Sequence, residues 1–371
     1  MATKSVGAKS SRSGPVDRLG RLRLSFSALG SDAILVSHLP NIHYLCGFTG
    51  SAGLLLVDSS SVTLFTDSRY TFQAREEVLG ARVQICKRGL IRAAAEALRS
   101  RKGRTRLAFS ASTMTVAQKA SLDAASGNRI RWVADGNAVE KLRAVKDPGE
   151  LRIMREAAQA ISAVFERLLP QIRPGIAELA IAAEIEHEIK RLGGSGTSFE
   201  TIVASGPRSA WAHARPTPKL LGKNELVVLD QGAILRGYCS DMTRTVFVGK
   251  ASGKVKSLYS AVLEAQDAGK RAIRPGVTAG DVDKAARNTL KRARLDRYFT
   301  HSLGHGLGLE VHELPRLGKG EETVLQEGMV LTVEPGVYIE GVGGIRIEDD
   351  VVVTAGGVEV LTSAPREFLE L

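Results

Sequence analysis

The sequence has little cysteine and no long hydrophobic run. Its 371 residues include only three cysteines, Cys46, Cys86 and Cys239. Because this set is odd in number and widely spaced, it indicates free thiols in a reducing compartment rather than a disulfide framework. No apolar run reaches the roughly 18 residues that a membrane-spanning helix needs. We therefore expect a cytoplasmic protein that has no membrane partner.

Acidic residues are missing from the first fourteen positions, which are rich in Ser, Lys and Arg. No apolar segment follows them, so a secretory signal is not expected. We predict a disordered basic tail over residues 1–14, with an organellar transit peptide as the alternative. Aromatic residues are also scarce, at 5% of the chain, and few lie among the basic residues that give the net charge of +11. Because no nucleic-acid-binding motif accompanies that charge, we expect no nucleic-acid partner.

The length of the chain predicts two domains. Over residues 15–140, short apolar runs alternate with helical patterns, which is typical of an α/β domain with a mixed or mainly parallel sheet. The expected strands lie near residues 33–36, 53–57, 62–65, 83–85, 107–109 and 130–133, and the expected helices near 69–78, 90–98 and 116–125. Asp147-Pro148-Gly149-Glu150 marks a break, and a proline there can begin the next helix. We place the second domain at residues 147–371.

The second domain contains an internal repeat. Ile172-Arg173-Pro174-Gly175 recurs as Ile273-Arg274-Pro275-Gly276, an offset of 275 − 174 = 101 residues, and each copy lies between two helical patterns. Further along, two acidic positions are echoed by two others at offsets of 334 − 230 = 104 and 348 − 241 = 107. A period near 100 residues indicates a domain-scale duplication rather than a solenoid. Two copies packed about a pseudo-twofold axis would bring their carboxylates together.

The echoed carboxylates each lie at or near the end of an apolar strand; they are Asp230, Asp241, Glu334 and Glu348. Buried carboxylates without partners are costly. Arg244 and Arg346 are too few cations to neutralise them, whereas two divalent ions would balance four negative charges. The histidine- and glycine-rich stretch from Thr300 to Glu313 offers His305 as a neutral nitrogen ligand. This oxygen-rich set favours Mn²⁺, with Co²⁺ or Zn²⁺ as alternatives, and two such ions can activate a water for attack on a carbonyl group.

The motifs of the second domain resemble those of a known family. The matching segments are L-D-Q-G, Y-C-S-D-M-T-R-T, H-S-L-G-H-G-L-G-L-E-V-H-E, T-V-E-P-G-V-Y and G-I-R-I-E-D-D. Together they resemble the pita-bread metallopeptidases, and among these the Xaa-Pro aminopeptidase and prolidase branch. The resemblance covers nearly the whole chain. It implies an N-terminal creatinase-type α/β domain followed by an α+β pita-bread domain with an internal pseudo-twofold duplication.

The resemblance also implies a role for each ligand. Asp230 would chelate one metal, and Asp241 and Glu348 would bridge both. His305 and Glu334 would bind the other metal, and Glu334 would also carry a proton during the reaction.

Further roles around the metals follow from the same resemblance. His213 would line the substrate site, His312 would hydrogen-bond the scissile carbonyl oxygen, and His301 would be another pocket histidine. Arg346 would steady the bridging carboxylates from behind. Arg316 would hold the free carboxylate of a substrate proline with two parallel hydrogen bonds, or else be an ordinary surface arginine.

The resemblance therefore predicts a dinuclear metallo-exopeptidase that hydrolyses the bond between an N-terminal residue and a following proline, as an Xaa-Pro aminopeptidase or an Xaa-Pro dipeptidase. Proline-containing peptides would be its substrates, and it would form a homodimer. One alternative is a methionine-type aminopeptidase, which typically lacks the large N-terminal domain. Another is a non-catalytic peptide-binding protein on the same fold, which typically lacks the metal ligands.

Other polar and aromatic residues have structural interpretations. His38 and His43 flank Pro40-Asn41 in an expected loop, where a polar role is favoured over chemistry. Tyr338 could be a simple core side chain. Trp211 could either pack or line the substrate pocket.

Overall fold

The computed structural model describes residues 14–101, 103–127 and 129–371, and the chain divides into two compact units at Arg143 and Ala144. Of the predicted basic tail only Gly14 lies within the described residues, where it precedes helix α1 (Pro15–Leu29). In the described ranges, no helix combines the length and the apolar character that crossing a membrane requires.

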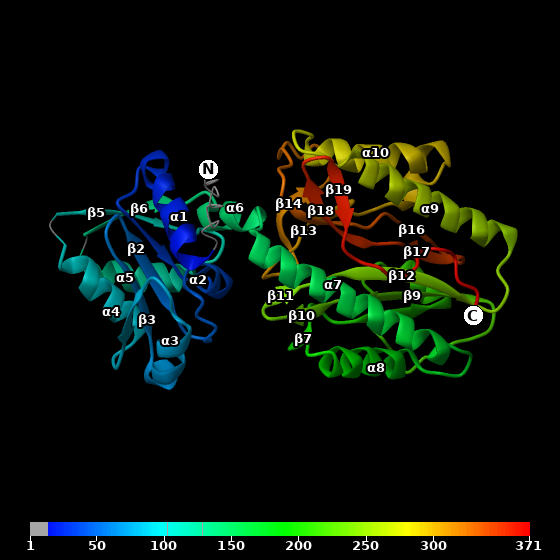
Figure 1. Ribbon diagram of the computed structural model, residues 1–371, viewed down its shortest axis with the longest axis horizontal. Coiled ribbons are helices and arrows are strands. Elements are labelled where there is room, and N and C mark those ends of the chain that lie inside the picture. The colour runs from blue at the N-terminus through cyan, green and yellow to red at the C-terminus, as the bar shows by residue number, and fades with distance from the viewer. Residues whose placement is uncertain (1–13, 102, 128) are drawn as a thin grey trace, which may run out of the picture. The chain divides into compact units, whose positions relative to one another are not determined.

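The first unit is built on a six-stranded mixed sheet (Figure 1). The order is β4-β3-β2-β1-β5-β6; the β1–β2 and β2–β3 pairs are antiparallel and the other three pairs are parallel. Its strands are β1 (Ala33–Val36), β2 (Leu54–Asp58), β3 (Val62–Thr66), β4 (Arg82–Ile85), β5 (Thr105–Phe109) and β6 (Ile130–Ala134). Its further helices are α2 (Leu39–Cys46), α3 (Thr71–Glu77), α4 (Leu90–Arg99), α5 (Val116–Ser126) and α6 (Ala138–Ala144). The predicted α/β architecture is confirmed.

The prediction of a loop around Pro40-Asn41 is wrong, because these residues belong to α2. Pro40 lies in the first turn of that helix, where the missing N–H costs nothing since it would have no intrahelical partner. His38 precedes the helix and His43 lies in its last turn. Burial lowers the pKa of His43, as expected for a neutral imidazole packed inside the unit.

The second unit repeats one order of elements, a long helix, a shorter helix and then strands. The helices are α7 (Pro148–Leu168) and α8 (Glu178–Arg191) in the first half, and α9 (Gly253–Ala272) and α10 (Ala279–Arg292) in the second. Gly175 and Gly276 of the repeated motif both have φ of 88°, a left-handed conformation that glycine adopts without strain. Their N–H groups make equivalent bonds, to Leu221 O at 2.8 Å and to Leu325 O at 3.0 Å. The predicted duplication is confirmed, and the two copies share the backbone conformation and hydrogen bond of this glycine.

Each helix pair packs against strands of its own half. Phe165 and Ile185 of α7 and α8 pack against Leu229 of β9, and Val262 of α9 packs in one core with Leu331 of β15. Figure 1 shows β9 and β12 lying between α8 on one side and α9 and α10 on the other. The main strand orders are β12-β9-β8 and β14-β13-β15-β18-β19. The strands are β7 (Gly196–Thr197), β8 (Ile202–Ser205), β9 (Glu225–Gln231), β10 (Ala233–Leu235), β11 (Tyr238–Cys239), β12 (Met242–Val248), β13 (Gly304–Gly306), β14 (Glu313–Leu317), β15 (Val330–Val333), β16 (Gly336–Ile339), β17 (Gly343–Arg346), β18 (Asp349–Thr354) and β19 (Gly357–Val360).

Candidate metal centre and active site

Four carboxylates and one imidazole converge where the strands of the two halves meet. Asp230 lies on β9, and Asp241 immediately precedes β12. Glu334 immediately follows β15, and Glu348 lies between β17 and β18. His305 is the central residue of β13. All four carboxylates thus lie at or near the end of a strand, as the sequence predicts.

The distances within this group are short. Nε2 of His305 lies 3.8 Å from Oδ2 of Asp241 and 3.5 Å from Oε1 of Glu334. Asp241, His305 and Glu348 each offer one ligand atom, and these atoms lie within 4.8 Å of one another. The sequence alone gives no such proximity, since the ligands are separated by up to 348 − 230 = 118 positions.

Thr243 links Asp230 to Glu348, another member of the carboxylate group. In the β9–β12 register Thr243 pairs with Asp230, and its hydroxyl donates to Oε2 of Glu348 at 2.6 Å. The backbone N–H of Glu348 donates to the carbonyl oxygen of Thr243 at 3.1 Å. A second residue that the sequence did not single out, Asp350, accepts the backbone N–H of Asp241 at 3.0 Å. Both residues lie within the matched segments, but their contacts with the proposed ligands arise only from tertiary pairing.

These carboxylates resist being ionised together. Burial raises the pKa of Asp241 and of Glu348 well above the usual range, and the neighbouring carboxylates raise them further. Burial also raises the pKa of Glu334, to about 8. Oδ1 of Asp230 is buried and finds no hydrogen-bond partner among the described residues, which is rare for a buried polar atom. A bound cation would give that oxygen a partner and would favour the ionised forms of Asp241, Glu334 and Glu348.

His305 completes a donor set that fits divalent cations. Burial lowers its pKa to about 4, and His312 lowers it further, so its imidazole is neutral near pH 7 and can act as a ligand. Carboxylate oxygens with one imidazole suit a hard or borderline divalent ion. None of the three cysteines, Cys46, Cys86 or Cys239, belongs to this cluster.

Arg346 connects the carboxylates to the pocket histidines. Its Nη2 donates to Oδ2 of Asp230 at 2.6 Å, and its Nη1 donates to the Tyr338 hydroxyl at 2.7 Å and to Ala212 O at 3.1 Å. The Tyr338 hydroxyl also lies 3.0 Å from Nε2 of His301. The interpretation of Tyr338 as a simple core residue is therefore wrong, because its hydroxyl links Arg346 to His301.

This link requires a glycine at position 336. A Cβ at Gly336 would lie 2.5 Å from the Tyr338 hydroxyl and 3.1 Å from Nε2 of His301. Burial, followed by the charge of Arg346, lowers the pKa of His301 to about 4. His301 is thus a neutral histidine with one ring nitrogen committed to Tyr338.

The remaining predicted residues lie around the same centre. The ring centroids of His312 and His305 are 4.3 Å apart. Arg316 pairs with His305 across β13 and β14, which puts both side chains on one face of the pair. His213 lies on the loop between the 3₁₀ turn Gly206–Ala210 and β9, and its charge contributes to lowering the pKa of His312 after burial.

Several of these side chains face solvent. His213 and His312 are exposed, and within the described residues neither makes a side-chain hydrogen bond. Arg316 is exposed as well, and its Nε donates to Oγ of Ser302 at 2.6 Å. Trp211 is 62% exposed beside the His213 loop, where the Arg208 guanidinium lies 5.0 Å from its ring centroid.

Comparison with known families accounts for both units. Residues 152–355 match metallopeptidase family M24, and residues 18–145 match the creatinase/prolidase N-terminal domain. The chain belongs to metallopeptidase family M24. The resemblance to pita-bread metallopeptidases, with a creatinase-type first domain, is therefore confirmed, and this M24 peptidase is a metal-dependent hydrolase.

Relatives match over almost the full length of the M24 peptidase. It is 41% identical to the uncharacterized peptidase YqhT of Bacillus subtilis, over 95% of this chain and 100% of that one. The structure of an Xaa-Pro dipeptidase from Bacillus anthracis superposes with a TM-score of 0.93 at 38% identity, covering 96% of this chain and 100% of the other. The X-Pro aminopeptidase of Thermotoga maritima gives 0.87 at 36% identity, with 95% and 99% covered.

Proposed function

We propose that this peptidase hydrolyses the bond between an N-terminal residue and a following proline. The observation that carries the proposal is the convergence of Asp230, Asp241, His305, Glu334 and Glu348 at one largely buried site. It is supported by similarity, across both domains, to solved structures described as an Xaa-Pro dipeptidase and an X-Pro aminopeptidase.

The five ligands would hold two divalent ions, with Mn²⁺ as the first candidate and Co²⁺ or Zn²⁺ as alternatives. Asp230 would hold one ion, His305 and Glu334 the other, and Asp241 and Glu348 would contact both. Such a pair of ions supplies a Lewis acid for the scissile carbonyl and lowers the pKa of a water molecule. The four carboxylates would balance the charge of two such ions.

The chain's own residues would orient the substrate and move the proton. His312 would donate a hydrogen bond to the carbonyl oxygen, where negative charge develops during attack. The nitrogen before the proline ring carries no hydrogen, so it must gain a proton to leave. Glu334, held by the Thr332 hydroxyl at 3.3 Å, would take a proton from the attacking water and deliver it to that nitrogen. Arg346, which the resemblance assigns to the bridging carboxylates, bonds Asp230 instead and would keep that ligand in place.

The test is hydrolysis of Xaa-Pro and Xaa-Pro-Xaa peptides by the purified protein in the presence of Mn²⁺, Co²⁺ or Zn²⁺. Matched Xaa-Ala peptides and the Asp241→Asn variant are the controls, and neither should give comparable turnover. Preferential removal of methionine from Met-Ala peptides would favour a methionine-type aminopeptidase. Binding of metals and Xaa-Pro peptides without cleavage would instead support a non-catalytic binding protein.

Arg316 is the residue that we propose as the determinant of a preference for dipeptides. It lies opposite His305, and among the described residues no carboxylate pairs with it, so its guanidinium is available to a substrate carboxylate. We expect Arg316→Ala to weaken the transition state of Xaa-Pro dipeptides by about 1.5–3 kcal/mol, the range for hydrogen bonds to charged groups. Xaa-Pro-Xaa tripeptides should lose much less, because their carboxylate lies further out.

Steady-state kinetics on matched peptide pairs measures this difference in kcat/KM. Lys319→Ala is the control, since Lys319 is an exposed cation just beyond β14. Equal losses on both peptide lengths, or none on either, would contradict a carboxylate-binding role for Arg316 and favour a general Xaa-Pro aminopeptidase.

Assembly and location stay predictions. We infer a homodimer from the family resemblance, and light scattering on the purified protein would test it. Cys46, Cys86 and Cys239 are all buried and free, which supports a reducing compartment such as the cytoplasm. Cell fractionation would test that location.

A further inference from the structure

The segment that carries His301 has no regular secondary structure of its own. Residues 299–303 connect the 3₁₀ turn Asp296–Tyr298 to β13 without forming a helix or strand. Yet this segment must place the His301 ring against Tyr338 and deliver His305 into the metal centre. Its backbone groups therefore need partners from elsewhere.

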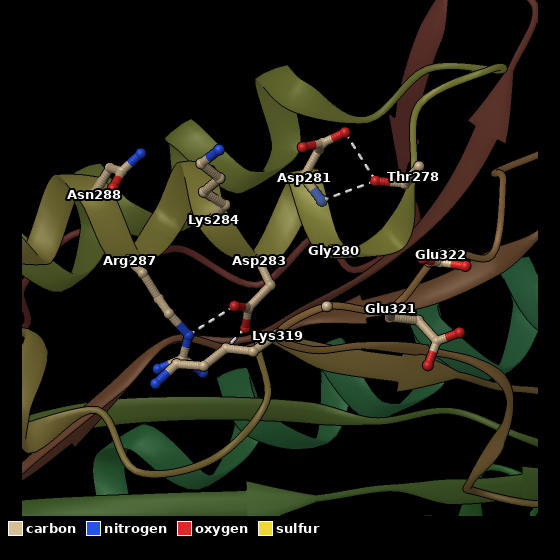
Figure 2. A pocket seen from close by; sticks show the side chains of 11 residues that line it. Thr278, Gly280, Asp281, Asp283, Lys284, Arg287, Asn288, Lys319, Glu321 and Glu322 are labelled. Atoms are coloured by element: carbon tan, nitrogen blue, oxygen red, sulfur yellow. Dashed lines mark hydrogen bonds and ion pairs between the residues drawn. The ribbon is translucent and has the colours of Figure 1, made fainter.

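An ion pair on α10 supplies partners along one edge of this segment. Arg287 donates through Nη1 to Phe299 O at 3.0 Å and through Nη2 to His301 O. Asp283 accepts the backbone N–H of Leu303 at 3.1 Å. The two side chains pair with each other through Nε to Oδ2 at 2.6 Å and Nη2 to Oδ1 at 3.0 Å. Figure 2 shows this pair projecting from α10.

The spacing of these contacts explains why two side chains suffice. Residues 299, 301 and 303 alternate along the chain, so in an extended segment their backbone groups can face the same edge. Asp283 and Arg287 are four apart on a helix, so their side chains lie on one face. The pair thus replaces the hydrogen bonds that a neighbouring strand would make. The Arg287 guanidinium also lies 4.1 Å from the centroid of the Phe299 ring, a favourable cation–π contact.

Two further backbone bonds connect the segment and the following strand to residues at the metal centre. Glu334 donates its backbone N–H to Leu303 O at 2.8 Å, and His305 donates its own to the Thr332 hydroxyl at 3.1 Å. The segment is therefore held between α10 and β15. Only the α10 side depends on residues that have no proposed contact with metal or substrate.

The first half of the domain holds its own histidine loop in a related way. Glu178, at the start of α8, accepts the backbone N–H groups of Ser205 and Thr217 at 2.9 and 3.1 Å. These two residues flank the loop that carries His213. Arg208 pairs with Glu178 at 3.2 Å and donates to Arg215 O. In each half, therefore, a buried carboxylate on α8 or α10 pairs with an arginine and accepts backbone hydrogen bonds from a segment that carries or flanks a histidine.

We propose that Asp283 and Arg287 are positioning residues, which hold residues 299–303 so that His301 and His305 point into the active site. This inference rests on the proposed peptidase reaction and deepens it. Neither residue would touch substrate or metal. Arg287 would act through the carbonyl groups of Phe299 and His301, and Asp283 through the N–H of Leu303.

The surroundings of Arg287 make a direct test possible. It lines a surface cavity of about 460 Å³ together with Lys284, Asn288, Lys319 and Glu321. Arg287→Ala would open the space of its guanidinium into that cavity. A free guanidinium ion is small enough to enter and could again bridge Asp283 to the two carbonyl groups. Lys284→Ala removes a cation from the same cavity without touching residues 299–303, so it is the matched control.

We expect Arg287→Ala to lower kcat on an Xaa-Pro peptide by about 10- to 100-fold, because misplacement of a catalytic group by about 1 Å can cost that much. KM should change only a few-fold. Millimolar guanidinium, at concentrations that leave the wild-type melting temperature unchanged, should restore activity to Arg287→Ala but not to His301→Ala. Lys284→Ala should behave as the wild type. Wild-type kcat in Arg287→Ala, or a loss that guanidinium does not restore in the folded variant, would overturn the inference.

A second variant and a second measurement keep the outcome decisive. If Arg287→Ala does not fold, Arg287→Lys still pairs with Asp283 but cannot reach both carbonyl groups, so its kcat should fall as well. Nitrogen NMR of labelled histidines reports the His301 ring directly, with its signal assigned by its absence in His301→Ala. That signal should shift in Arg287→Ala and return with guanidinium; an unshifted signal would contradict the proposal. If the wild type cleaves no peptide, the proposed function fails, and the NMR signal alone decides the positioning role.

Discussion

Gly304 offers a test of how closely β13 and β15, which position His305 and Glu334, must approach each other. It begins β13 directly before His305 and faces Thr332 of β15. A Cβ at position 304 would lie 2.0 Å from Thr332 O and 2.7 Å from its Oγ1, whereas ordinary contact begins at 3.4 Å. An alanine there would push β13 and β15 apart by about 3.4 − 2.0 = 1.4 Å if neither strand distorts.

Separating the two strands would displace the proposed metal ligands His305 and Glu334. The Thr332 hydroxyl accepts the N–H of His305 and contacts Oε1 of Glu334, so both ligands would move. Misplacement of a reacting group by about 1 Å can cost on the order of 100-fold. We therefore expect Gly304→Ala to lower kcat/KM on Xaa-Pro peptides by about 100-fold and to weaken Mn²⁺ binding. Overpacking should also lower the free energy of unfolding by about 1–3 kcal/mol.

Peptide kinetics, calorimetric titration with Mn²⁺ and thermal unfolding measure the three effects. At about 2–4 °C per kcal/mol for a unit of this size, the melting temperature should fall by roughly 2–12 °C. Gly196→Ala on β7 is the control, because a Cβ there meets nothing within 4 Å. A Gly304→Ala protein that retains wild-type kcat/KM and Mn²⁺ affinity would refute the reasoning, even if its melting temperature fell.

Three further predictions concern the ligands, the pocket and the first-half loop. Chelation should abolish activity, and Mn²⁺ or Co²⁺ should restore it. Asp241→Asn or Glu348→Gln should lose the second ion, because each carboxylate would bind both ions. Metal analysis that finds two ions in these variants would contradict that assignment. His312→Ala should lower kcat by on the order of 10²–10³ with a smaller change in KM, and an effect on KM alone would make His312 a ground-state binding residue. Burial opposes the charge of Glu178, but hydrogen bonds from Ser205 and Thr217 and the charge of Arg208 outweigh it, so its pKa lies below the ordinary 4.5. Its charge therefore stabilises the fold above about pH 4.5, and that stabilisation is lost as the pH falls through the lower folded pKa. The difference in melting temperature between wild type and Glu178→Gln should shrink over that window, and a difference that is constant with pH would contradict the expectation.

Local chemistry explains which elements could be predicted from the sequence. Asp147 forms a capping box with Glu150 at the start of α7, with Pro148 in the first turn, and such short-range signals can be read directly. Helix α2 was missed because a proline and two histidines look like a turn, although burial of its apolar face against the first unit outweighs those signals. Propensity is a weak prior that tertiary packing often overrides.

The sequence by itself determined the fold class, the duplication and the identity of the five proposed ligands. The repeated Ile-Arg-Pro-Gly and the echoed carboxylates are properties of the chain, and burying four acids together is costly enough to predict a cation. The tertiary structure alone decided how Arg346 reaches Asp230, how Tyr338 joins it to His301, and that Arg287 holds the carbonyl group of His301. Arg346 and Asp230 are 116 positions apart. Contacts of this kind depend on strand register and on which helix face meets which loop, and these are set by packing of the whole unit rather than by any short stretch of sequence.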